Sequence, residues 1–138
     1  MRNMSFMLTT PQMYSGTKKV TRRVGWWNLK PGDVVMAVEK GMGLKKGEKV
    51  VQIYQIMIVE TRPETLDCML RDQEYGKSEV VLEGFPMMTP QEFVSMFCAS
   101  HKGCTPETIV NRIRFRRVSV IPMENPTPPI TSIERINA

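Results

Sequence analysis

A run of β-branched and aromatic residues at positions 49–60 restricts the possible folds most strongly. Such residues favour a pleated, largely buried strand: Val50, Val51, Ile53, Tyr54, Ile56, Ile58 and Val59. A second run, at 110–118, alternates in the way a half-buried strand requires. Its arginines, Arg112, Arg114 and Arg116, share one side, while Ile113 and Phe115 share the other. Shorter strands are expected at 4–8, 34–39 and 79–82. The chain should therefore build a sheet.

The clearest helix signal is Thr89, Pro90 and Glu92. Threonine is a good N-cap, proline fits the first helical position, and glutamate completes a capping box. This helix should end near residues 101–103. A shorter helix should begin at Thr10, the expected N-cap, and end at Gly16, because glycine takes the left-handed conformation at low cost. Further along, we expect a strand stop at Pro63, a short helix at 64–70 and a loop at 71–77.

Several strands with few, short helices indicate an α+β fold. We expect a small, mostly antiparallel β-barrel with the helices at its rim. A chain of 138 residues is long enough for one domain with its own core, which we place at residues 1–121. The prolines that follow predict an extended tail at 122–138, the only feature that favours a protein partner: Pro122, Pro126, Pro128 and Pro129.

The net charge of +5 and a pI near 9.3 favour polyanionic partners. No apolar run approaches the roughly 20 residues that cross a bilayer. The N-terminal apolar run is broken by Thr9, Thr10 and Pro11 before it reaches the length of a secretory signal. The chain has three cysteines at irregular spacing, which does not indicate a disulfide framework. We therefore expect a cytoplasmic protein that does not act at a membrane.

The densest cluster of charge surrounds Thr21 and consists of Lys18, Lys19, Arg22 and Arg23. A helix that ends at Gly16 would hold this cluster in a fixed turn. Such a turn suits a phosphate, a carboxylate or the polar edge of a base. A solvated basic loop is the alternative. The arginine row of strand 110–118 has the same two interpretations.

Glu83 lies in an apolar segment directly ahead of the capped helix. A carboxylate in such a place is costly unless it is paired, and Lys18 or Arg23 is the expected partner. The resulting group, Lys18, Thr21, Arg23 and Glu83, is either a functional site or an ion pair that ties the basic turn to the helix.

Cys98, His101 and Cys104 have the spacing of half a zinc site. A closed structural site needs four ligands, and the chain has only Cys68 as a further thiol and no second histidine. Burial in the core explains Cys98 better. A cysteine–histidine nucleophile pair would lack a group that orients it. We therefore expect no metal and no other cofactor.

The motif Gly16-x-Lys18-x-x-Thr21-x-Arg23 is followed by Leu29-Lys30-Pro31-Gly32-Asp33. Glu83-Gly84-Phe85 then precedes Thr89-Pro90-Gln91-Glu92-Phe93. In this order, over residues 9–118, the motifs resemble the ASCH domain (activating signal cointegrator homology domain), a family of PUA-like β-barrels. The Arg22-Arg23 pair is similar to that of its small stand-alone bacterial and phage members.

The resemblance implies a cleft between barrel and helices that binds RNA, another single-stranded nucleic acid or a modified nucleobase. Lys18, Thr21 and Arg23 would line the cleft, with Glu83 opposite. The remaining cations would add electrostatic attraction: Lys19, Arg22, Arg112, Arg114 and Arg116. Trp26 would either stack on a base or pack in the core.

Some ASCH members are amidohydrolases that remove the acetyl group of N4-acetylcytidine with a lysine, a threonine and a glutamate. Lys18, Thr21 and Glu83 match these positions. The resemblance then implies that a neutral Lys18 acts as nucleophile or general base, Glu83 shuttles the proton, and Thr21 orients the lysine or a water. A ribonuclease that uses the same cleft is a further alternative.

Overall fold

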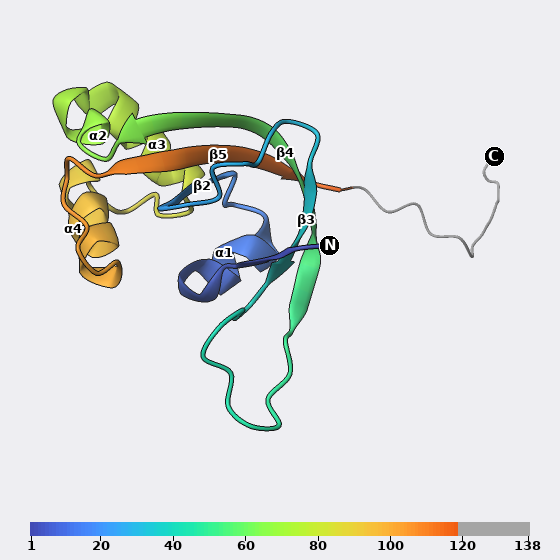
Figure 1. Cartoon of the computed structure of the whole chain (residues 1–138). Coiled ribbons are helices and arrows are strands. Elements are labelled where there is room, and N and C mark those ends of the chain that lie inside the picture. Colours follow the sequence, from blue (N-terminus) through green and yellow to red (C-terminus); the bar gives the residue numbers. More distant parts are fainter. Residues whose placement is uncertain (119–138) are drawn as a thin grey trace, which may run out of the picture.

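The computed structural model describes residues 1–118 and shows a five-stranded mixed sheet with four α-helices (Figure 1). The strands lie in the order β1-β3-β4-β5-β2. Their bounds are Asn3–Ser5 for β1, Val20–Arg23 for β2, Val34–Val38 for β3, Gln52–Thr65 for β4 and Ile109–Arg117 for β5. The sheet confirms the α+β class that the sequence predicts.

The predicted closed barrel is wrong for the described residues. The edge strands β1 and β2 lie at opposite ends of the sheet, and each pairs with one neighbour only, β3 and β5 respectively. A barrel needs a second neighbour for every strand. The β1–β3 pair is also parallel, whereas the other pairs are antiparallel. The result is an open sheet that is mostly, but not wholly, antiparallel.

The longest strand, β4, continues through Pro63, where the sequence predicts a stop. From residue 58 onward β4 pairs with β5 alone, because β3 pairs only with positions 52–57. Proline lacks a backbone donor, and an edge position tolerates that loss. The predicted first strand is likewise shorter than expected: β1 ends at Ser5, and Met7–Thr9 forms a 3₁₀ turn.

The helix α3, Gln73–Leu82, replaces the loop and strand that were predicted for residues 71–82, so that prediction is wrong. Asp72 caps this helix by accepting a hydrogen bond from the Tyr75 amide. Gly76 weakens the helical signal, yet the structure needs a glycine here. An added Cβ would lie 2.2 Å from the Met69 carbonyl oxygen and 2.8 Å from the Pro90 ring. Gly76 thus allows close packing of three helices, α3, α4 and α2 (Cys68–Arg71).

The helix α4, Pro90–Ser100, has the predicted capping box. The Thr89 hydroxyl accepts from the Glu92 amide at 3.1 Å, and the Glu92 carboxylate accepts from the Thr89 amide at 2.8 Å. The helix α1, Thr10–Ser15, ends as predicted at Gly16, whose φ is 76°. Thr9 rather than Thr10 precedes α1, and no side chain caps it.

Two separate hydrophobic cores stabilise the molecule. The first lies between α1 and the sheet, with residues such as Phe6, Met13, Ile56, Ile113 and Phe115. The second joins α2, α3 and α4 to the end of the β4–β5 pair: Leu66, Met69, Val80, Phe93, Val94, Phe97 and Val110. In Figure 1 these three helices gather at one end of the long β4 and β5 arrows, and α1 lies below their middle.

A protruding arm, residues 39–51, joins β3 to β4 (Figure 1) and carries Lys40, Lys45, Lys46 and Lys49. Within residues 1–118, no helix has the length and apolar character to cross a membrane. The tail predicted at 122–138 lies outside the described residues.

Candidate functional site

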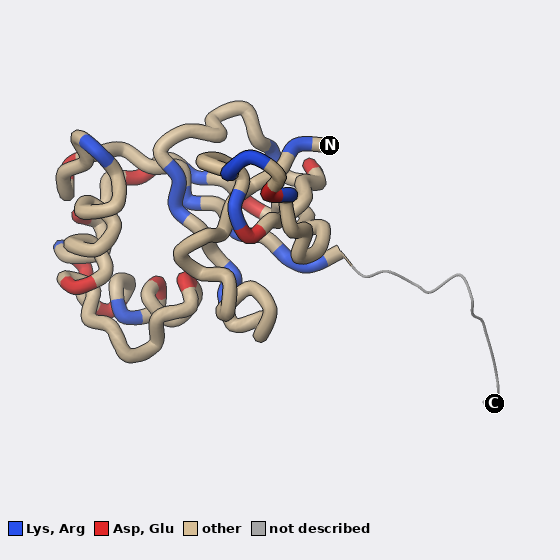
Figure 2. The backbone as a smooth tube through the Cα atoms, turned by 90° about the horizontal axis from the view of Figure 1, so that it is seen from below, with Lys and Arg blue, Asp and Glu red and all other residues tan. Residues whose placement is uncertain are grey.

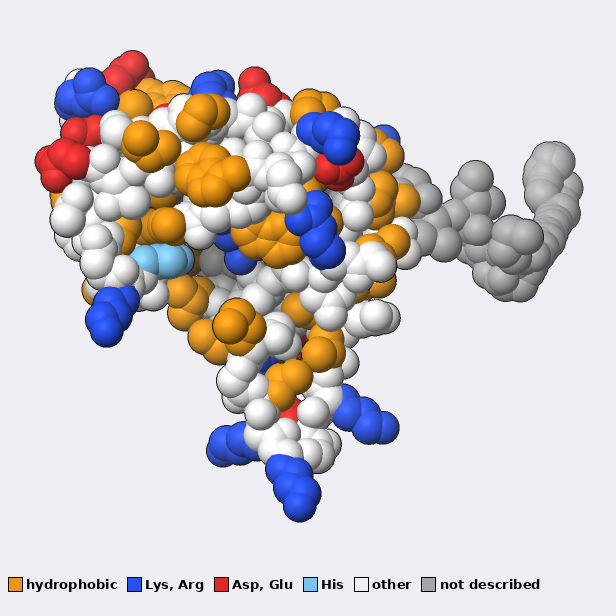
Figure 3. Space-filling view, in the orientation of Figure 1, with side chains coloured by type: hydrophobic (Ala, Val, Ile, Leu, Met, Phe, Trp, Pro, Cys, Tyr) orange, Lys and Arg blue, Asp and Glu red, His pale blue; other side chains and the backbone are white. Residues whose placement is uncertain are grey.

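A cavity of about 250 Å³ opens between the two cores. Its walls come from the end of β1, the 3₁₀ turn, the turn after α1, β2, the segment after α3, and α4 with the residue that follows it. The lining residues are Ser5, Met7, Leu8, Thr9, Lys18, Thr21, Arg22, Arg23, Glu83, Phe85, Phe93, Met96, Phe97, Ser100 and His101. Figure 3 shows the hollow beside His101, with hydrophobic side chains around it. The structure therefore brings the four residues of the predicted site, Lys18, Thr21, Arg23 and Glu83, into one cavity.

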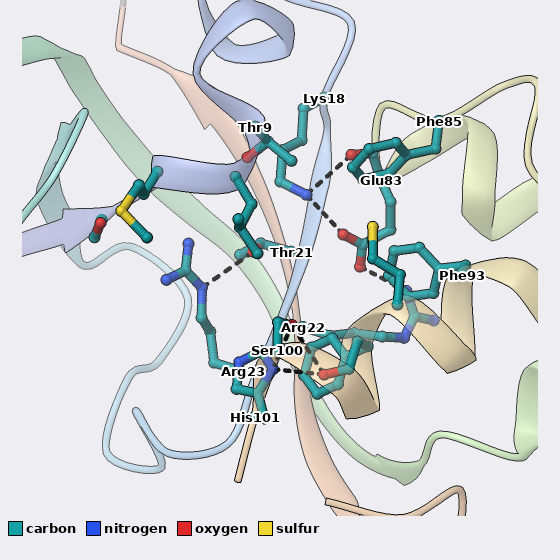
Figure 4. Close-up of a pocket in the computed structure, with 15 residues that line it drawn as sticks. Thr9, Lys18, Thr21, Arg22, Arg23, Glu83, Phe85, Phe93, Ser100 and His101 are labelled. Carbon is teal, nitrogen blue, oxygen red and sulfur yellow. Dashed lines mark hydrogen bonds and ion pairs between the residues drawn. The ribbon is translucent and has the colours of Figure 1, made fainter.

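Lys18 and Glu83 form a buried pair at the base of this cavity (Figure 4). The Lys18 ammonium donates to the Glu83 Oε1 at 2.6 Å and to the Glu83 carbonyl oxygen at 3.0 Å. Burial lowers the pKa of Lys18 below its ordinary value, although the charge and hydrogen bond of Glu83 act in the opposite direction. Lys18 is thus more easily deprotonated than a surface lysine.

The backbone brings these two segments together. The Lys19 amide donates to the Leu82 carbonyl at 2.7 Å, directly beside Glu83. Gly84 follows with a φ of 98°, and an added Cβ would lie 2.8 Å from the side chain of Gln12 in α1. The Glu83-Gly84 sequence therefore permits the close approach that places a carboxylate against the turn after α1.

Arg22 holds the second oxygen of Glu83. Its guanidinium donates to Glu83 Oε2 at 2.9 Å, to Glu64 at 2.9 Å and to Glu79 at 2.6 Å. Burial acts to lower the pKa of Arg22, but the three carboxylates outweigh it and raise the pKa. Arg112 binds the same Glu79 through two hydrogen bonds, at 2.6 and 3.0 Å. Both arginines, which the sequence suggests for nucleic-acid contact, are buried ion-pair partners, and Arg22 also lines the cavity.

Arg23 points to the other side of β2, because successive strand residues face opposite ways. Its Nε donates to the Thr21 hydroxyl at 3.1 Å, and its Cζ lies 4.6 Å from the centre of the Phe6 ring. No carboxylate of residues 1–118 pairs with it. Burial lowers the pKa of Arg23 to about 10, so it stays a cation at neutral pH. Arg23 is therefore a cation free to bind a ligand in the cavity (Figure 4).

An aromatic wall that the sequence does not predict as part of the site faces these polar groups. Phe85, Phe93 and Phe97 pack in series as tilted pairs, with ring centres 6.0 and 6.3 Å apart and angles of 54° and 37° between the rings. His101 stacks on Phe97 at 4.0 Å with an angle of 12° between the rings. The spacing of four residues on the predicted helix was the available signal for this stack.

The other predicted binding residues lie outside this cavity. Trp26 packs partly buried against the first core, with Arg2 over its ring at 5.0 Å. Lys19, Arg114 and Arg116 are exposed. In Figure 2 Lys and Arg positions and Asp and Glu positions both occur in the middle of the trace and at the helical end at the left.

Cys98 and Cys104 are free thiols whose sulfur atoms lie 3.6 Å apart. Burial, together with Cys104, raises the pKa of Cys98 to about 11, which disfavours the nucleophilic thiolate. The His101 Nδ1 lies 2.8 Å from the Phe97 carbonyl oxygen. Among the residues described, no group of three or more His, Cys, Asp or Glu side chains is placed to hold a metal ion.

Comparison with known proteins gives a structural likeness. No protein-family model matches the chain, and no curated protein does so either. The crystal structure of hypothetical protein PH0355 is similar, with a TM-score of 0.58 and 16% sequence identity. The match covers 84% of this chain and 97% of that one. At this identity the likeness shows a shared fold and carries no function.

Proposed function

We propose that the cavity between the two cores binds a modified nucleobase or nucleoside, free or within single-stranded RNA. The observation that carries the proposal is the combination of an aromatic wall with fixed polar groups in one small cavity. Bases stack on aromatic side chains with about 1–3 kcal/mol each. Lys18, Thr21 and Arg23 supply donors for the polar edge of a base, and Glu83 supplies acceptors.

The volume favours a small ligand. Ligand pockets typically measure about 300–1,000 Å³, and this cavity, at about 250 Å³, lies just below that range. One base with a small substituent suits that space better than a large substrate. The ASCH resemblance supports the same ligand class, and we extend the proposal to membership of that family on the strength of its ordered motifs.

Equilibrium titration with N4-acetylcytidine and with cytidine tests the binding proposal. Arg23→Gln should weaken binding of the acetylated nucleoside at least about tenfold, because a charge-assisted hydrogen bond contributes about 1.5–3 kcal/mol. Lys77→Gln is the matched control, since Lys77 is exposed on α3 and does not line the cavity. Equal affinity of wild type and Arg23→Gln would refute the assignment.

Hydrolysis of an acyl amide on the bound base is the second candidate function. The buried Lys18, 2.6 Å from Glu83, favours it. Water would add to the acetyl carbonyl carbon and lose a proton to the neutral Lys18 amine. Glu83 would relay that proton to the exocyclic nitrogen as the C–N bond breaks. The products would be acetate and the free amine of the base, and the Thr21 hydroxyl would orient the water.

Release of acetate from N4-acetylcytidine tests this second function. Lys18→Ala and Glu83→Gln should each lower kcat at least about a hundredfold, the usual contribution of a general acid or base. Lys19→Ala is the control, because it removes the neighbouring lysine, whose side chain is exposed. Turnover that survives in Glu83→Gln would refute the role of Glu83, and no acetate release by wild type would leave the binding function alone in place.

A further inference from the structure

A second cavity, of about 240 Å³, lies beside the turn that follows α1. Its walls come from the end of α1, that turn, β4 and β5: Met13, Tyr14, Ser15, Gly16, Lys18, Lys19, Tyr54, Phe115, Arg116 and Arg117. Lys18 lines both cavities, so a single residue separates the second from the proposed base site. None of the functions considered above uses this second cavity.

The cations of the second cavity differ from those of the buried network. Lys19, Arg116 and Arg117 are exposed, and within residues 1–118 none of them pairs with a carboxylate. The only polar contact of the Arg116 side chain in the described part is a donation to the Met57 sulfur at 3.5 Å. Figure 2 shows this cationic end of β5 directly before the grey trace. Three cations in one cavity without counter-charge repel one another, and a bound anion relieves that repulsion.

Tyr54 gives this cavity a fixed wall. Its hydroxyl donates to the Met13 carbonyl oxygen at 2.6 Å, and the Arg117 Cζ lies 4.6 Å from the ring centre. The acid on this side, Glu39, is engaged by the Tyr14 hydroxyl at 2.7 Å. The cavity therefore offers guanidinium and ammonium donors around a rigid aromatic side chain.

We propose that this second cavity binds the backbone phosphate of a single-stranded nucleic acid whose base occupies the first cavity. The proposal rests on the proposed function of that first cavity. Arginine suits phosphate because its planar donors match two phosphate oxygens. Because Lys18 borders both cavities, the proposed phosphate site adjoins the proposed base site. The natural ligand is then a base within a strand rather than a free nucleoside.

The test compares two probes, free N4-acetylcytidine and a mixed-sequence ten-nucleotide RNA, with wild type and the double variant Lys19→Gln, Arg117→Gln. RNA affinity is measured as a function of salt concentration. Each phosphate that a protein neutralises on a single strand contributes about 0.7 to the slope of log affinity against log salt, so the double variant, which removes this one phosphate site, should lose about 0.7. Its affinity for the uncharged nucleoside should stay within about twofold of wild type.

The control is Lys77→Gln, which removes one exposed positive charge outside both cavities. An unchanged salt slope in the double variant overturns the phosphate site. So does a loss of slope in Lys77→Gln that is equal, per charge removed, to the loss in the double variant. Nucleoside binding without any RNA binding overturns it too and leaves the proposed function intact. RNA binding with the expected slopes but no nucleoside binding refutes the proposed function instead.

Discussion

Glu83 connects the cavity to the buried ion-pair network, because its two carboxylate oxygens have different partners. One oxygen accepts from Lys18 in the cavity, and the other accepts from Arg22 in the buried network. The sequence predicted Lys18 or Arg23 as the partner. Lys18 is confirmed, and Arg22 takes the place of Arg23. Strand alternation puts Arg22 and Arg23 on opposite faces of β2, but the sequence does not show which face carries the acids.

The lowered pKa of Lys18 predicts a pH-dependent stability. The unfolded chain holds the lysine proton up to its ordinary pKa near 10.4, whereas the folded protein releases it at lower pH. The unfolded state therefore binds more protons, and the free energy of unfolding rises with pH in that window. Urea unfolding of wild type and Lys18→Met between pH 6 and about 10 measures this.

The difference between the two proteins isolates Lys18, because all other titrating groups are common to both. We expect wild type to gain stability relative to Lys18→Met as the pH rises. Parallel curves for the two proteins would contradict an easily deprotonated Lys18.

Among the elements, α4 was predictable and α3 was not. The capping box of α4 is a local pattern, so Thr89, Pro90 and Glu92 define the helix start without tertiary information. In α3 the decisive contact is non-local: Gly76 packs against the Met69 carbonyl and Pro90. In the sequence alone a glycine at this position indicates a loop. Its actual role, close packing against two other helices, depends on tertiary contacts that the sequence does not show.

Gly76→Ala tests the packing of α3. Helix propensity alone would stabilise the protein by about 1 kcal/mol. The added Cβ, however, would collide with backbone at 2.2 Å, and overpacking of this kind costs about 1–3 kcal/mol. We expect net destabilisation in chemical denaturation, with exposed Lys77→Ala near neutral. A more stable Gly76→Ala would show that the helices are less closely packed.

At the scale of the whole molecule, a buried ion-pair network joins three neighbouring strands of the sheet, β4, β5 and β2, to the helix α3. Arg22 from β2 and Arg112 from β5 share Glu79 of α3, and Arg22 also binds Glu64 of β4. This network is not predictable from the sequence, because exposed and buried arginines look alike in an alternating strand. Its burial also explains why a net charge of +5 overstates the cations available to a ligand.

The lowered pKa of Glu79 predicts that the free energy of unfolding falls at acid pH. Burial acts to raise the pKa of Glu79, but hydrogen bonds from Arg112 and the charge of Arg22 prevail and lower it. A lowered folded pKa adds stability above the ordinary value near 4.5, and this stability is lost as pH falls through the folded pKa. Glu79→Gln should therefore flatten the acid limb of the stability curve.

At pH 7 the same substitution leaves two buried guanidinium groups short of a charge partner. Loss of one partner of a buried pair costs about 3–5 kcal/mol, which a denaturant titration resolves easily. An acid limb as steep in Glu79→Gln as in wild type would mean that other carboxylates control acid unfolding.

Methionine methyl NMR tests the central claim, that the cavity between the two cores is the ligand site. Met7 and Met96 line this cavity, whereas Met42 lies exposed on the arm and Met57 lies on β4 outside it. On titration with N4-acetylcytidine, the methyl signals of Met7 and Met96 should shift in a saturable way while those of Met42 and Met57 stay in place. Saturable shifts at Met42 or Met57 without any at Met7 and Met96 would contradict the account.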